Sequence, residues 1–78
     1  MNVDTAPRRR FSAAALRRRR RELEMSQADL ATKVGRRRNA VNRWEAQTRV
    51  PPEPVVPLIA AALGIPEADL YEDLPPAA

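Results

Sequence analysis

The chain has 78 residues, enough for one domain, and it contains neither cysteine nor histidine. These absences exclude disulfides, thiolate zinc sites, thiol nucleophiles and imidazole acid–base chemistry. With only 2 glycines, no glycine-rich phosphate loop can be formed. We therefore expect a small globular domain that is not an enzyme and that uses no metal and no cofactor.

Charge is divided unevenly along the chain. Residues 1–49 contain all 14 basic residues and half of the 10 acidic ones, whereas residues 50–78 contain the other acidic residues and no basic one. All but one of the cations are arginine, whose planar guanidinium suits phosphates and guanine edges. This pattern predicts a polyanionic partner, with nucleic acid as the first candidate and an anionic membrane as the second.

The arginines near the N-terminus do not predict export. Residues 8–12 (RRRFS) have a twin-arginine form, but the arginines at 17–21 interrupt the apolar stretch that such a signal requires. No window approaches the ~20 apolar residues of a membrane span. An organelle transit peptide is a weaker alternative, and we expect a cytoplasmic protein.

Residues 1–10 combine a proline, a triple arginine and one small aliphatic residue, which predicts a disordered basic arm. Ser12 fits the N-cap of a first helix that runs from Ala13 to about Leu23, since this segment contains only good helix formers. Most of the arginines at 17–21 are expected to form a solvated face, with one or two of the five reaching phosphate.

Two further helices follow. Ser26 and Asp29 form a variant of the capping box, which predicts that a second helix begins at Gln27, and Gly35 ends this helix. A third helix is predicted over about residues 37–45. Its apolar positions lie three residues apart, so its buried face is narrow.

Two prolines define a loop over residues 47–52, and a fourth helix is predicted over about residues 54–63. A short fifth helix is expected over 67–71, and residues 74–78 are expected to be disordered. No strand pattern is present. The predicted fold class is therefore all-α, a compact bundle of about five short helices that occupies residues 11–73.

Residues 27–45 carry the functional signal, because two short helices separated by a glycine turn form a helix-turn-helix. Ala31 is small where the two helices cross, and Gly35 lies at the turn. Val41 and Trp44 would anchor the second of these helices, so that its opposite face can enter a major groove.

At these positions the chain resembles the lambdoid phage repressor and Cro type, or xenobiotic-response-element type, of helix-turn-helix regulators. The matching residues are Ser26-Gln27-x-x-Leu30-Ala31, Val34-Gly35, Val41 and Glu45, with Ala60 to Ile65 resembling the family's fourth helix and its exit. The resemblance covers roughly residues 16–71. It implies a lambda-repressor-like fold and a sequence-specific, double-stranded DNA-binding transcriptional regulator, expected to be a repressor.

The resemblance also implies roles for single residues. Contacts to DNA bases are expected from Arg38, Asn39, Asn42 and Arg43. Contacts to the DNA backbone are expected from Ser26, Gln27, Arg36 and Arg37, and Gln27 can also brace the first base-reading residue. A family salt bridge that joins the first helix to the end of the third falls on Arg20 and Glu45.

The chain departs from the family pattern at three places. Arg36 occupies a turn position that is usually aliphatic or small, which favours a phosphate contact there. Glu24 stands where the family often has glycine, which favours a first helix that continues further. Ala46 and Gln47 replace the usual residue-glycine pair after the glutamate.

Several alternatives remain open from the sequence. Arg8, Arg9 and Arg10 would be either a minor-groove arm or a solubilising tail. One monomer covers about one half-site, so a homodimer on a palindromic operator is expected. The rival functions are a protein-interaction adaptor or antitoxin-like module that uses the Leu70-Tyr71 end, and a nonspecific DNA or RNA binder.

Overall fold

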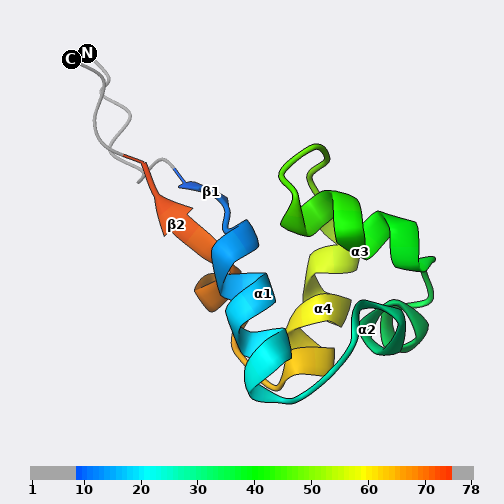
Figure 1. Ribbon diagram of the computed structural model, residues 1–78. Helices are drawn as coiled ribbons and strands as arrows, with labels where there is room; N and C mark the ends of the chain where they lie inside the picture. The colour runs from blue at the N-terminus through cyan, green and yellow to red at the C-terminus, as the bar shows by residue number, and fades with distance from the viewer. Residues whose placement is uncertain (1–8, 75–78) are drawn as a thin grey trace, which may run out of the picture.

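The computed structural model describes residues 9–74, in which four α-helices lie beside a two-stranded ribbon (Figure 1). The helices are α1 (Ala13–Glu22), α2 (Gln27–Val34), α3 (Arg38–Glu45) and α4 (Val56–Leu63), with 3-10 turns at Glu53–Val55 and Glu67–Leu70. The strands are β1 (Arg9–Phe11) and β2 (Tyr71–Asp73). Residues 1–8 and 75–78, which hold most of the predicted arm and tail, lie outside the described residues.

The helix ends follow local chemistry. The Ser12 hydroxyl accepts a hydrogen bond from the Ala15 N–H at 3.0 Å and so begins α1. The helix ends at Glu22, and Glu24 adopts a left-handed backbone with φ of 55°. The absence of glycine at position 24 favoured a longer first helix, and that prediction is wrong. Pro57 lies in the first turn of α4, where its missing N–H leaves no hydrogen bond unmade.

The core draws on every helix. The large, fully buried residues are Leu16 of α1, Leu30 of α2, Val41 of α3, Val55 of the first 3-10 turn, Ile59 and Leu63 of α4, and Leu70 of the last 3-10 turn. Trp44 is also buried, so α3 is attached to this core by two side chains three residues apart. No helix within residues 9–74 is long and apolar enough to cross a bilayer.

The predicted helical, lambda-repressor-like fold is confirmed, but the structure adds a small antiparallel ribbon that the sequence did not predict. β1 pairs with β2 in the register Arg9 with Asp73, Arg10 with Glu72 and Phe11 with Tyr71. The expected fifth helix is only a 3-10 turn, and Tyr71 begins the strand instead of ending a helix. Arg9 and Arg10, which were expected to belong to the disordered arm, instead belong to β1.

An aromatic contact joins the two strands of the ribbon. The rings of Phe11 and Tyr71 lie opposite each other, edge to face, with centroids 6.3 Å apart. The Ser12 N–H also donates to the Leu70 carbonyl at 2.7 Å, which connects the ribbon to the N-cap of α1. Leu70 is buried in the core, so it does not offer the exposed apolar end that the protein-adaptor reading needs.

Candidate nucleic-acid interface

The turn between α2 and α3 has the predicted left-handed residue. Gly35 has φ of 71°, and the Arg36 N–H donates to the Ala31 carbonyl at 2.9 Å. A Cβ at Gly35 would meet no atom within 4 Å, so the backbone conformation, not a lack of space, requires glycine here. This turn sets the direction in which α3 leaves α2.

The second helix of the motif, α3, has one buried and one exposed face. Val41 and Trp44 face the core. The four predicted base-reading residues are exposed and share the other side of the helix: Arg38, Asn39, Asn42 and Arg43. Arg37 is the N-cap, with an extended backbone and no side-chain cap hydrogen bond. Within residues 9–74, no ion pair engages Arg37, Arg38 or Arg43.

The start of α2 is fixed by a reciprocal cap. The Ser26 hydroxyl accepts from the Asp29 N–H at 2.9 Å, and the Asp29 carboxylate accepts from the Ser26 N–H at 3.0 Å. The backbone hydrogen bond from Ser26 lowers the pKa of Asp29, and the hydroxyl contact adds to the effect. The Ser26 hydroxyl oxygen thus accepts a hydrogen bond within the helix cap, and its O–H remains able to donate a hydrogen bond to an outside acceptor such as a phosphate.

Gln27 connects the two helices of the motif. Its Nε2 lies 3.2 Å from the Glu45 Oε1 and 3.4 Å from the Asn42 Oδ1. The structure therefore brings Gln27 to Asn42, in the middle of α3, and not to a residue at the start of that helix. Gln27 holds Asn42 from the α2 side.

The ion pair of Arg20 and Glu45 joins α1 to the end of α3. Arg20 donates from Nη2 to the Glu45 Oε1 at 2.9 Å and from Nε to the Glu45 Oε2, while its Nη1 donates to the Met25 carbonyl at 2.7 Å. The side chains are only 10% and 5% exposed. Burial acts to raise the pKa of Glu45, but hydrogen bonds from Arg20 and Gln27 and the nearby positive charge of Arg17 leave this pKa below its ordinary value. The hydrogen bond to Glu45 raises the pKa of Arg20.

The arginines of the predicted arm are engaged by the C-terminal strand. Arg10 forms an ion pair with Glu72, and the Arg9 guanidinium lies 5.1 Å from the centre of the Tyr71 ring. Arg8 lies outside the described residues. Both described arginines are exposed, and the Arg10–Glu72 contact is at the surface, where ion pairs are weak.

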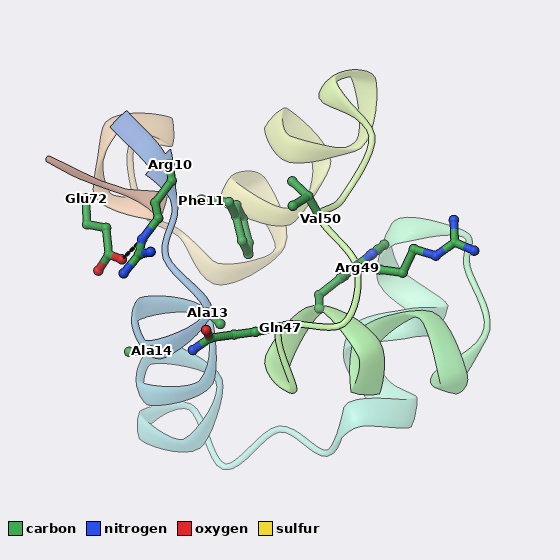
Figure 2. Close-up of a pocket in the computed structure, with 9 residues that line it drawn as sticks. Arg10, Phe11, Ala13, Ala14, Gln47, Arg49, Val50 and Glu72 are labelled. Atoms are coloured by element: carbon green, nitrogen blue, oxygen red, sulfur yellow. Dashed lines mark hydrogen bonds and ion pairs between the residues drawn. The ribbon is translucent and has the colours of Figure 1, made fainter. Parts of the chain in front are cut away.

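A hollow of about 320 Å³ adjoins the end of α3, between β1, the start of α1 and the loop after α3 (Figure 2). Its walls include Phe11, Trp44 and Val50. Figure 2 shows the Gln47 side chain directed toward Ala13 and Ala14 at the start of α1. No carboxylate-rich cluster suited to a metal ion occurs within residues 9–74.

The loop that follows α3 departs from the family pattern at Ala46 and Gln47, so the sequence left its phosphate contacts open, and it predicted no role for Arg49. Gln47 has a left-handed backbone with φ of 66°, and it occupies the position where the family pattern has glycine. Arg49 is exposed and lines a second hollow of about 270 Å³ together with Arg36 and Arg43. The sequence feature that could have pointed to Arg49 is a cation a few residues after the helix, in a loop that ends in two prolines.

The core, the glycine turn and the exposed polar face of α3 define a helix-turn-helix protein. A family model described as "Helix-turn-helix" matches residues 16–70, and the chain therefore belongs to this family, in its lambdoid repressor and Cro branch. Helix-turn-helix domains of this branch are DNA-binding units of transcription regulators, and this chain shares their fold. A comparison with curated proteins gave no match.

Two solved structures are similar to this chain. The P22 c2 repressor protein, in complex with synthetic operator 9T in the presence of Tl⁺, matches with a TM-score of 0.73 and 26% identity over 78% of this chain and 92% of that one. Cobalt(II) HppE in complex with substrate matches with a TM-score of 0.65 and 29% identity over 85% of this chain, but over only 35% of the HppE chain.

Proposed function

We propose that this protein is a sequence-specific regulator that binds double-stranded DNA, acts as a repressor and reads the major groove with α3. The observation that carries the proposal is the exposed polar face of α3, whose arginines have no ion-pair partner within the described residues while the opposite face is buried. A helix anchored in this way presents its polar side chains on the side that can enter a groove.

The side chains on this face divide by chemistry. The arginine fork matches guanine O6 and N7, and an asparagine amide matches adenine N6 and N7. We assign base contacts to Arg38, Asn39, Asn42 and Arg43. We assign backbone contacts to Ser26, Gln27, Arg36 and Arg37, which flank this helix at the start of α2 and in the turn.

DNA as the partner is supported by the P22 c2 repressor, which was crystallised with an operator. A dimer on a palindromic site follows from the reach of one recognition helix, which covers about one half-site. The match to HppE covers about a third of that chain, so the substrate of HppE gives no reason to propose an enzymatic activity here.

The N-terminal arginines belong to the proposal as a minor-groove arm. Arg9 and Arg10 would have to exchange their contacts with Tyr71 and Glu72 for DNA. Because the Arg10–Glu72 pair is exposed, this exchange has a low energetic cost.

Selection of bound duplexes from a random pool tests the proposed function. The expected result is enrichment of a palindromic consensus, which would also give the half-site spacing. If no sequence is enriched while all duplexes bind with a steep salt dependence, the protein is a nonspecific nucleic-acid binder and the proposal fails.

A further inference from the structure

The run of five arginines on α1 separates into two groups. Arg19 donates from Nε to the Leu63 carbonyl at 3.0 Å and pairs with Glu22, and Arg20 is buried against Glu45. These two arginines therefore hold α1 to α4 and α3. The other three, Arg17, Arg18 and Arg21, are exposed, and their side chains make no hydrogen bond or ion pair within residues 9–74.

The three exposed arginines lie on one side of α1, where they line two adjoining hollows. One hollow, of about 720 Å³, is lined by all three together with Gln47, Glu22 and Glu45, and the two carboxylates are paired with Arg19 and Arg20. A smaller one, of about 200 Å³, is lined by Arg17 and Arg21 together with Gln27 and Asn42. The arginine side of α1 is thus continuous with the face of α3 that carries the proposed base contacts.

Helix stability alone does not account for these charges. Arg17 and Arg21 are four residues apart, and like charges at this spacing destabilise a helix by about 0.2–0.5 kcal/mol. Arg21 is in the last turn, where a cation is favoured by the helix dipole, and Arg18 is four residues before Glu22, a spacing that favours opposite charges. Arg17 has neither benefit within the helix.

We infer that Arg17, Arg18 and Arg21 form a second DNA-contacting surface, which grips the phosphates of the DNA strand beside the groove entered by α3. This inference rests on the proposed function and extends it. One turn of α1 separates Arg17 from Arg21 by about 6 Å along the helix axis. That length spans about two phosphates of a strand, whose spacing along the duplex axis is about 3.4 Å.

The surface carries affinity and no sequence preference, because guanidinium contacts to phosphate are the same for every base pair. It also differs from the arm of Arg9 and Arg10, which is engaged by β2. The arginines of α1 need no such exchange before they bind DNA.

The test replaces Arg17, Arg18 and Arg21 with glutamine, singly and together, in the full chain. Lys33→Gln is the matched control, because Lys33 is an exposed cation on α2 that lines neither hollow. Binding to the selected duplex and to a scrambled duplex is measured at several salt concentrations, and thermal unfolding checks that the variants fold.

Each single variant that removes a phosphate contact should reduce the slope of log affinity against log salt by about 0.9, and the triple variant by up to about 2.7. The ratio of affinities for selected and scrambled duplexes should stay constant. The inference is overturned if the single variants change the salt slope no more than Lys33→Gln does. That outcome would leave the proposed function standing whenever the wild-type protein still prefers the selected duplex, so the two failures are distinguishable.

Discussion

Arg20 and Glu45, 25 positions apart in the sequence, form a bidentate ion pair that attaches the last residue of α3 to α1. The same carboxylate also accepts a hydrogen bond from Gln27 of α2. Glu45 therefore connects all three helices that determine how the polar face of α3 is presented. The orientation of α3 therefore depends on the contacts of Glu45 with α1 and α2.

Removing one partner of this pair should be costly. Glu45→Ala leaves the Arg20 guanidinium buried without its carboxylate, and we expect a loss of about 3–5 kcal/mol in the free energy of unfolding. The double variant Arg20→Met/Glu45→Met should lose much less unfolding free energy than Arg20→Met and Glu45→Met lose in sum. Urea unfolding measures all of these, with Arg10→Ala as an exposed comparison that should cost no more than about 1 kcal/mol. Additive losses in the double variant would mean that the two residues are not coupled.

Stability should fall on the acidic side only. A carboxyl whose pKa is lowered in the folded state adds stability above its unfolded pKa, and this stability is lost as the pH falls toward the folded value. Glu45 and Asp29 are both of this kind. With no histidine in the chain, the free energy of unfolding should be flat from about pH 6 to 8 and decline below about pH 5.

The Glu45→Gln variant should make that acid decline shallower, whereas Glu53→Gln, at an exposed position, should not. Chemical unfolding at closely spaced pH values measures the slope. Identical acid slopes in the wild type and in Glu45→Gln would contradict this assignment.

The two left-handed positions that flank α3 should respond in opposite directions. Gly35→Ala forces a Cβ into a backbone with φ of 71° and should cost about 1–2 kcal/mol. Gln47 already bears such a side chain at φ of 66°, so Gln47→Gly should stabilise the domain by about 0.5–1 kcal/mol. Thermal unfolding of both variants decides this. Destabilisation by Gln47→Gly would show that its side-chain contact at the start of α1 outweighs the backbone strain.

The cap of α2 should have a measurable effect. Ser26→Ala removes the acceptor of the Asp29 N–H, and we expect a loss of about 1 kcal/mol. Ser26→Asp keeps an acceptor and should retain most of the stability, so this variant separates the capping role from a role in DNA binding. Equal losses in both variants would contradict the capping explanation.

Local signals were sufficient to predict most of the helical fold. Ser12, Ser26 and Gly35 act through neighbours within four residues, so the start of α1 and both ends of α2 can be read from the sequence. The ribbon could not be read in this way, because its strands have three residues each and come from opposite ends of the chain. Tyr71 continues a helix-forming segment in the sequence, but in the structure it is extended and paired with Phe11.

The site shows the same division. Burial of Val41 and Trp44 follows from their spacing, and it places the polar residues of α3 on the opposite side. The division of the arginines on α1 into two groups does not follow from their spacing. Arg19 and Arg20 differ from their neighbours because α4 and α3 place an acceptor beside each of them. The hydrogen bond from Gln27 to Asn42 likewise depends on the angle between the two helices.

The most direct test of base reading by α3 compares Arg38→Ala and Arg43→Ala with Arg36→Ala, on the selected duplex and on single-mismatch duplexes at two salt concentrations. All three variants remove the same charge from exposed positions of the helix-turn-helix. We predict that Arg38→Ala and Arg43→Ala each cost about 1–3 kcal/mol on the selected duplex and relax specificity at one base pair per half-site. Arg36→Ala should weaken binding to every duplex alike and reduce the salt slope by about one. An equal loss of affinity for every sequence in all three variants would contradict base reading through the arginines of α3.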